Sequence, residues 1–225
     1  PLIVALDVET FDEAKALVQK LGDSVEIYKI GSQLFTAFGP EAVREISGKG
    51  KKIFLDLKFH DIPNTVAGAV RATKNINAFM MTVHTQGGKA MMQAAAKAAA
   101  DLPHQPMIIG VTIITSMAQA DLEDIGLKNS VTEQVKKLAS LAQESGLAGV
   151  VCSPHEIEAL RTQCGKDFKL IVPGIRPEGT AHGDQKRVMT PKEALAKGAD
   201  YLVIGRPITE AESPILAAKN ILASL

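Results

Sequence analysis

The chain consists of eight short apolar runs that alternate with segments of helical, amphipathic periodicity. Near-continuous apolar strands separated by helices are typical of a parallel sheet that is covered on both faces. Eight strand–helix units in 225 residues predict a fold of the α/β class, a closed (β/α)8 TIM barrel. A doubly wound open sheet is the alternative, and the lack of a distinct edge strand favours closure. The predicted strands are 2–8, 25–30, 52–57, 78–84, 107–114, 148–152, 169–173 and 201–204.

Helix-start signals support this order of elements. In a capping box, Ser or Thr stands three residues before Glu, and each residue binds a backbone N–H of the other. Pro154 and Pro191 stand at first helical positions, where a missing N–H is harmless. The predicted boxes are Thr10 with Glu13, Ser130 with Glu133, Ser153 with Glu156 and Thr190 with Glu193.

Length and composition predict one domain over residues 1–225, because no linker-like stretch divides the chain. Lys plus Arg and Asp plus Glu both number 25, so nothing favours nucleic acid or an anionic membrane as partner. No apolar stretch approaches the roughly 20 residues that span a bilayer. The chain opens in a strand-like run without a signal-peptide pattern, and its two cysteines form no disulfide framework, so we expect a cytoplasmic protein.

One stretch is hard to explain by packing alone. The sequence F-L-D-L-K-F-H-D-I-P-N-T at 54–65 places Asp56, Lys58 and Asp61 directly after an apolar strand. Asp56 and Lys58 are two residues apart, so they point to the same side of a strand. Buried charges are costly unless they are paired. Asp7 and Lys29 end the first two predicted strands in the same way.

Active sites of barrels lie at the carboxyl ends of the strands. We therefore expect the polar residues at these ends to converge on one rim. A structural ion network is the simpler interpretation of the charges, but apolar replacement of such a network is often neutral or stabilising. A catalytic cluster that holds Lys58 protonated as a general acid explains them better. The predicted rim comprises Asp7, Lys29, Asp56, Lys58, Asp61, His84, Thr115, Ser116, Arg176, His182, Gln185, Gly205 and Arg206.

The loops after the last two strands predict a phosphate site. Gly205 and Arg206 open the final helical region, and Gly174 and Arg176 follow the seventh strand. Barrels commonly bind phosphate at these two loops. Glycine lets the backbone approach an anion and arginine can bind two of its oxygens, although a solvated surface arginine is the alternative.

Other site chemistries find no support in the sequence. The five histidines have no metal-ligand spacing, and neither the dinucleotide-binding nor the P-loop motif occurs. We expect His84 to be a hydrogen-bonded polar residue and Cys152 a small core residue. No metal and no cofactor is predicted.

Six segments together resemble the orotidine 5′-monophosphate decarboxylase family, most closely its bacterial branch. They occur in the family's order and cover essentially the whole chain. They are A-L-D-V at 5–8, Y-K-I-G at 28–31, the stretch at 54–65, T-I-I-T-S at 112–116, P-G-I-R-P at 173–177 and V-I-G-R-P-I at 203–208.

The resemblance implies conversion of orotidine 5′-monophosphate (OMP) to UMP and CO2 in pyrimidine biosynthesis, without metal or cofactor. Lys58 would protonate C6 of the pyrimidine. Lys29, Asp56, Lys58 and Asp61 would form the family's charged tetrad, in which the neighbouring subunit of a homodimer contributes the last aspartate.

The resemblance also implies the contacts that hold the substrate. Asp7 and Lys29 would bind the ribose, Thr65 would reach across the dimer interface, and Thr115 and Ser116 would meet the pyrimidine. The loop 177–187 would close over the phosphate. The phosphate ligands would be Arg176, Gln185, Gly205 and Arg206.

Two alternatives remain open at this point. The Mg²⁺-dependent 3-keto-L-gulonate-6-phosphate decarboxylases and 3-hexulose-6-phosphate synthases share D-x-K-x-x-D on the same fold. Those relatives have an acidic residue where this chain has Lys29, which argues against them. A non-catalytic phosphate-binding barrel is the second alternative, but such a protein would be expected to lack a tetrad charge, and none is missing.

Overall fold

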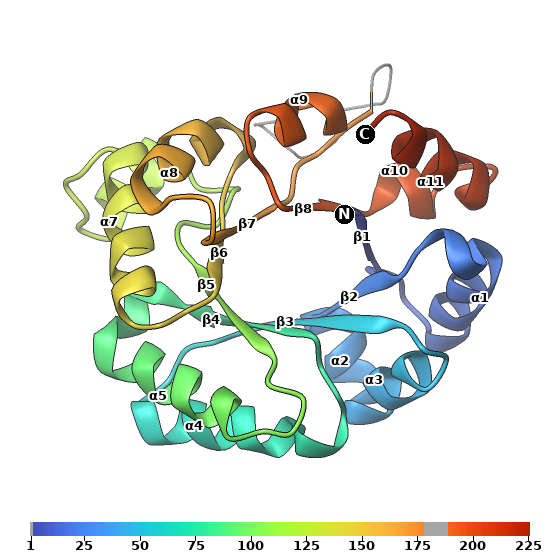
Figure 1. Cartoon of the computed structure of the whole chain (residues 1–225), viewed down its shortest axis with the longest axis horizontal. Helices are drawn as coiled ribbons and strands as arrows, with labels where there is room; N and C mark the ends of the chain where they lie inside the picture. Colours follow the sequence, from blue (N-terminus) through green and yellow to red (C-terminus); the bar gives the residue numbers. More distant parts are fainter. Residues whose placement is uncertain (1, 178–188) are drawn as a thin grey trace.

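The computed structural model describes residues 2–177 and 189–225, and within them eight parallel strands close into a barrel (Figure 1). Each strand pairs with the next, and β1 pairs with β8 through Leu2–Leu202 and Ile3–Val203. The predicted (β/α)8 architecture is therefore confirmed, and the open sheet is excluded. The strands are β1 Leu2–Ala5, β2 Ile27–Gly31, β3 Lys52–Phe59, β4 Met80–His84, β5 Met107–Val111, β6 Gly149–Val151, β7 Lys169–Val172 and β8 Tyr201–Ile204.

Helices surround the strands as an outer ring (Figure 1). None of the helices among the described residues is both long and apolar enough to span a membrane. The α-helices are α1 Phe11–Leu21, α2 Ser32–Phe38, α3 Pro40–Ser47, α4 Pro63–Ala72, α5 Gly88–Ala100, α6 Gln119–Asp124, α7 Val131–Glu144, α8 Ile157–Cys164, α9 Pro191–Ala196, α10 Arg206–Thr209 and α11 Pro214–Ala223. Short 3₁₀ turns occur at Gly22–Ser24, Thr73–Asn75, Thr85–Gly87 and Pro154–Glu156.

The predicted helix starts are largely confirmed. Complete capping boxes with both hydrogen bonds begin α1 at Thr10, α7 at Ser130 and α9 at Thr190. At the fourth site Glu156 accepts a hydrogen bond from the Ser153 amide at 2.7 Å, and Ser153 precedes a 3₁₀ turn, Pro154–Glu156, that leads into α8. Side-chain caps that satisfy free N–H groups thus set where these helices begin.

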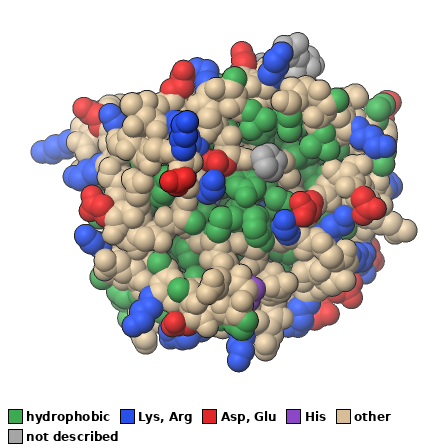
Figure 2. Space-filling model, viewed as in Figure 1, with side chains coloured by type: hydrophobic (Ala, Val, Ile, Leu, Met, Phe, Trp, Pro, Cys, Tyr) green, Lys and Arg blue, Asp and Glu red, His purple; other side chains and the backbone are tan. Residues whose placement is uncertain are grey.

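The core has two layers, one inside the barrel and one between strands and helices. Residues alternate between them along each strand, so that Ile3 lies inside and Leu2 and Val4 outside. The inner layer fills the barrel and forms the floor under its carboxyl end. Figure 2 shows hydrophobic side chains gathered near the barrel axis on the face that is viewed. The inner layer comprises Ile3, Ala5, Ile27, Phe54, Met80, Ile109, Ile171 and Val203.

Several predicted strand ends were wrong. β1 ends at Ala5 and β5 at Val111, whereas the apolar runs continue to residues 8 and 114. The apolar composition continues past the last paired residue because loop residues such as Leu6 and Ile113 are also buried. β3, in contrast, extends to Phe59 through an irregularity in its pairing with β4 between Leu55 and Phe59. This irregularity lies at the candidate site.

Candidate active site

Lys29 and Asp56 occupy the inward positions directly above the apolar floor. Lys29 follows Ile27 by two residues on β2, and Asp56 follows Phe54 by two residues on β3, so strand alternation directs both side chains into the barrel. Parallel pairing sets Ala5 of β1 beside Lys29. The sheet register therefore brings residues from three strands to one point.

Four side chains from the loop after β1 and from β2 and β3 form a row of alternating charge. Lys29 Nζ lies 2.8 Å from Asp7 Oδ1 and 3.9 Å from Asp56 Oδ2. Lys58 Nζ lies 2.9 Å from the same Asp56 oxygen. The side chains of Lys29 and Asp56 are both 12% exposed, whereas that of Lys58 is 37% exposed. Each buried charge has an opposite neighbour, and Lys58 retains an accessible ammonium group.

Lys58 reaches this position through an unusual backbone conformation. Its φ is +51°, in the left-handed region that non-glycine residues rarely occupy. The ladder between β3 and β4 is interrupted here, and the Lys58 amide donates instead to Thr82 Oγ1 at 2.8 Å. Thr82 Oγ1 in turn donates to Asp56 Oδ1 at 3.0 Å. Strand alternation correctly predicted that Asp56 and Lys58 meet, but it could not predict this irregularity.

Two residues that were not predicted from the sequence also shape the charged row. Thr82 follows the inward-facing Met80 by two residues, so the period of two was the signal that could have found it. Gly31 leaves space for the Lys29–Asp7 pair, since a Cβ at this position would lie 3.0 Å from Lys29 Nζ and 3.3 Å from Asp7 Oδ1.

A cavity of about 280 Å³ opens above Asp56 and Lys58. Most of its wall is apolar, and Thr115 and Ser116 from the loop after β5 supply hydroxyl groups. A flat, uncharged ring could lie against this wall with one edge facing the Lys58 ammonium. Its apolar lining consists of Phe54, Val111, Ile113, Ile114, Val151, Ile171, Pro173 and Val203.

A second, more polar cavity of about 350 Å³ adjoins the first, because Lys29, Pro173 and Val203 line both. Arg176 and Arg206 line this second cavity together with Asp7. The Arg176 side chain is largely buried and donates to the Ile175 carbonyl at 3.0 Å, and its amide bonds Met189. The two cavities together could hold a molecule with a flat ring at one end and an anion at the other.

Glycines allow close approach to the second cavity. Gly174 has φ +75°, which favours glycine, and Gly205 directly precedes the single turn of α10. Both line the cavity. The predicted convergence of Gly205, Arg176 and Arg206 on one site is therefore seen in the geometry.

Two predicted site residues, Asp61 and Thr65, do not line these cavities. Asp61 and Thr65 are exposed, in the loop after β3 and in the first turn of α4, and Asp61 Oδ1 accepts the neighbouring Ile62 amide at 2.6 Å. Gln185, like His182 and most of the predicted closing loop 177–187, lies outside the described residues.

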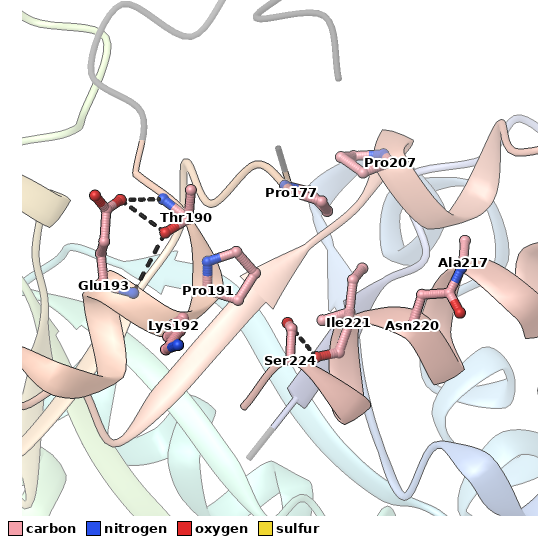
Figure 3. Close-up of a pocket in the computed structure, with 10 residues that line it drawn as sticks. All are labelled: Pro177, Thr190, Pro191, Lys192, Glu193, Pro207, Ala217, Asn220, Ile221 and Ser224. Carbon is pink, nitrogen blue, oxygen red and sulfur yellow. Dashed lines mark hydrogen bonds between the residues drawn. The ribbon is translucent and has the colours of Figure 1, made fainter. Parts of the chain in front are cut away.

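A pocket of about 490 Å³ lies elsewhere, between α9 and α11 (Figure 3). Thr190 and Glu193 border it, but their side chains are occupied by the cap of α9. Ser224 donates to the Ile221 carbonyl on its other side. This pocket contains none of the convergent charges of the rim, so size alone does not locate the candidate site.

The oxygens of Asp56 in the charged row contact neighbouring side chains of the protein, so the row is not arranged as a metal site. Asp56 Oδ2 contacts two ammonium groups and Oδ1 accepts from Thr82. Across residues 2–177 and 189–225, no three His, Cys, Asp or Glu side chains are grouped as metal ligands would be. A divalent cation would have to displace the lysines from Asp56.

A pair of histidines lies beside the charged row. The rings of His60 and His84 are 5.3 Å apart between centroids. Burial lowers the pKa of His84 from its ordinary value, and positive charge on His60 and Lys58 lowers this pKa further, while Asp56 opposes the shift. His84 is thus held neutral near pH 7.

The lowered pKa of His84 predicts a pH-dependent stability. The unfolded chain binds a proton at this residue as the pH falls through about 6.5, whereas the folded protein resists binding it. Because the unfolded state then binds more protons, the free energy of unfolding should fall as the pH is lowered from 7 to 5. Denaturant titrations of His84→Asn should show a flatter pH dependence than the unchanged protein.

The exposed His155 provides the matched control, and His155→Asn should keep the full slope. Part of the slope should survive in His84→Asn, because burial also lowers the pKa of His104. If the free energy of unfolding depends on pH equally in His84→Asn and in the unchanged protein, the pH dependence does not come from His84.

Comparisons with known proteins agree with this geometry. The family model described as "Orotidine 5'-phosphate decarboxylase / HUMPS family" matches residues 1–221. A curated relative named orotidine 5′-phosphate decarboxylase from Actinobacillus pleuropneumoniae serotype 5b (strain L20) is 51% identical over 225 residues, covering 100% of this chain and 98% of the relative. One of the same name from Moorella thermoacetica (strain ATCC 39073 / JCM 9320) is 50% identical over 230 residues, covering 100% and 91%.

Solved structures show the same fold over the same length. The crystal structure of orotidine 5′-phosphate decarboxylase from Lactobacillus acidophilus superposes with a TM-score of 0.90 at 36% identity, covering 100% of this chain and 98% of that one. The family model matches nearly the whole chain, and the curated relatives share about half of its residues. The chain belongs to the orotidine 5′-phosphate decarboxylase / HUMPS family.

Proposed function

We propose that this protein is an orotidine 5′-monophosphate decarboxylase, which converts OMP to UMP and CO2 in pyrimidine biosynthesis. The observation that carries the proposal is the row Asp7–Lys29–Asp56–Lys58, which lies between an apolar cavity and an arginine-lined one. The apolar cavity suits a pyrimidine and the arginine-lined cavity suits a 5′-phosphate. The reacting carbon then faces the Lys58 ammonium.

Lys58 is the proposed proton donor. The bond between C6 and the carboxylate carbon breaks, CO2 leaves, and the electron pair remains on C6. The ammonium group stabilises this negative charge and transfers a proton to C6, after which Lys58 regains a proton from solvent. The 2.9 Å contact with Asp56 fixes the ammonium group in one orientation before the substrate binds.

The neighbouring charges hold the donor and the sugar. Asp56 would lie near the departing carboxylate, and Lys29 offsets part of its charge from 3.9 Å. Asp7, whose side chain is 55% exposed beside the second cavity, is proposed to accept a hydrogen bond from a ribose hydroxyl, and Lys29 is proposed to donate one. Thr115 and Ser116 are the proposed hydrogen-bonding partners of the pyrimidine.

The phosphate is proposed to bind to Arg176, Gln185, Arg206 and the Gly205 amide. Arg176 and Arg206 line one cavity, and guanidinium groups bind phosphate oxygens in pairs. The phosphate contacts lie away from the reacting carbon, so their binding energy can be used to close the site and exclude water.

A homodimer with shared active sites is part of the proposal. Asp61 would complete the charged tetrad of a second subunit, and Thr65 would contact its substrate. The support is that both residues are exposed outside their own subunit's cavities, and that Ile62 between them is 66% exposed. A large apolar side chain at this position suits a surface that another subunit covers. A single domain over 1–225 and a cytoplasmic location complete the proposal.

The Mg²⁺-dependent relatives remain the second candidate, and the contacts of Asp56 argue against them. Those enzymes need a carboxylate that is open to a cation. Here both oxygens of Asp56 already have partners, and Lys29 places positive charge beside them. The non-catalytic barrel is disfavoured because the four charges of the row are present and paired.

The reaction in D2O tests the proposed chemistry. In D2O the Lys58 ammonium group carries deuterium, which it should transfer to C6 of UMP. The H6 signal should therefore be missing from the proton NMR spectrum of the product. Recovery of unchanged OMP would contradict the proposed function.

Replacement of Arg206 tests the assignment of the phosphate end. Arg206→Ala should weaken UMP binding about tenfold to a hundredfold because it removes charge-assisted hydrogen bonds. Binding of uridine, which lacks the phosphate, should change little. Isothermal titration with both ligands measures the difference.

Arg44 on α3 is the matched control, since its guanidinium pairs with Glu41 on the surface. Arg44→Ala should leave both affinities unchanged. An equal loss of UMP and uridine binding in Arg206→Ala would remove Arg206 from the phosphate site.

A further inference from the structure

The hydroxyl group of Thr82 connects the two most important residues of the charged row. Thr82 lies in β4 with its side chain fully buried. Its Oγ1 accepts from the Lys58 amide at 2.8 Å and donates its one proton to Asp56 Oδ1 at 3.0 Å. A hydroxyl has a single proton, so donation to Asp56 leaves its lone pairs facing the Lys58 amide. The two bonds therefore fix the direction of the hydroxyl.

The irregularity in β3 explains why such a group is needed. Regular pairing with β4 stops at Leu55–Met81 and resumes at Phe59–Val83, and Lys58 lies between with φ +51°. A left-handed lysine costs free energy that its surroundings must offset. Without Thr82 the Lys58 amide would lose the hydrogen bond that replaces its ladder partner.

The same hydroxyl acts on the side-chain end of Lys58. Asp56 binds the Lys58 ammonium through Oδ2 and the Thr82 hydroxyl through Oδ1. Thr82 thus holds both the backbone of Lys58 and the carboxylate that orients its Nζ. Other charged or titratable groups around Asp56 are Lys29 on β2 and His84 on β4.

We propose that Thr82 is a positioning residue for catalysis, which holds the left-handed backbone of Lys58 and the Asp56 carboxylate in the geometry that proton transfer to C6 requires. Thr82 lines neither cavity, so the proposed role is to position Lys58 and Asp56 rather than to bind the substrate. The proposal rests on the proposed decarboxylase function. It assigns a role to a residue that lies below the catalytic rim.

Thr82→Val tests the proposal, because valine keeps the shape of threonine and removes only the hydroxyl. We expect kcat to fall about tenfold to a hundredfold, since small displacements of a catalytic group have effects of this size. KM and UMP affinity should change little, because the phosphate and ribose contacts remain.

Thr112 offers a matched control. It is also a buried threonine and directly follows β5, the strand beside β4, but its hydroxyl donates to the Val151 carbonyl at 3.1 Å rather than to a charged residue. Thr112→Val should lose about as much stability as Thr82→Val and keep the kcat of the unchanged protein. Thr82→Ser, which restores the hydroxyl, should recover most of kcat.

Several outcomes would overturn the proposal. These are an unchanged kcat in Thr82→Val, an equal fall of kcat in Thr112→Val, and no recovery of kcat in Thr82→Ser. If Thr82→Val fails to fold, comparison of Thr82→Ser with Thr82→Cys makes the same test, because a thiol is a much weaker hydrogen-bond donor than a hydroxyl of similar shape.

Failure of the function and failure of this proposal can be told apart. The rate of the unchanged protein on OMP tests the function alone. Crystal structures of the unchanged protein and of Thr82→Val test the positioning without any turnover. The proposal expects the 2.9 Å contact between Lys58 Nζ and Asp56 to lengthen or break in the variant, and an unaltered contact would contradict it.

Discussion

Lys58→Ala is expected to reduce turnover of OMP by about 10⁴-fold or more, because one side chain supplies both the proton and the charge that stabilises the carbanion. The variant should still fold. Asp56 keeps a hydrogen bond from Thr82 and a cation, Lys29, at 3.9 Å, so its buried carboxylate is not left without partners. UMP should bind with nearly unchanged affinity through the arginine-lined cavity.

Lys52 on the same strand is the matched control for this variant. It lies at the opposite end of β3, where its Nζ pairs with Glu26 at 2.8 Å and lies 5.4 Å from the centre of the Phe79 ring. Lys52→Ala should therefore keep full activity. Substantial turnover in Lys58→Ala would show that another group donates the proton.

Mixing two inactive variants should restore activity if the active sites are shared. Lys58→Ala and Asp61→Ala should each be inactive alone. A mixed dimer contains one site in which both defects meet and one site that is intact. Random exchange of subunits should then recover about a quarter of the activity of the unchanged protein, since half of the dimers are mixed and each has one working site of two.

The control mixture combines Lys58→Ala with Asp56→Ala. These two residues are 2.9 Å apart within one subunit, so each site of a mixed dimer keeps one defect and no activity should return. Steady-state assays after co-refolding would measure both mixtures. Absence of recovery in the first mixture would contradict a shared site and assign Asp61 a role within its own subunit or none.

The barrel and its charged rim could be predicted because both depend on short-range patterns. Alternation of apolar strands and helices specifies a parallel sheet, and the position of a residue at a strand end specifies the rim. Asp7, Lys29, Asp56 and Lys58 were all found in this way, and register brings them into contact.

The remaining features depend on how neighbouring strands pair, which the sequence does not state directly. The left-handed conformation of Lys58 arises from a register shift between β3 and β4, and a lysine carries no local signal for it. Thr82 accepts a hydrogen bond from Lys58 because that shift frees a backbone amide beside it. The role proposed for Asp61 depends on a second subunit, and Gln185 lies outside the described residues.

The most direct test of the proposed function is the absorbance change of OMP when the purified protein is added in excess EDTA. We expect rapid conversion to UMP under these conditions, because Lys58 and its paired charges supply the catalysis without a divalent cation. No conversion of OMP, together with Mg²⁺-dependent turnover of 3-keto-L-gulonate 6-phosphate, would contradict the account and assign the charged rim to the alternative chemistry.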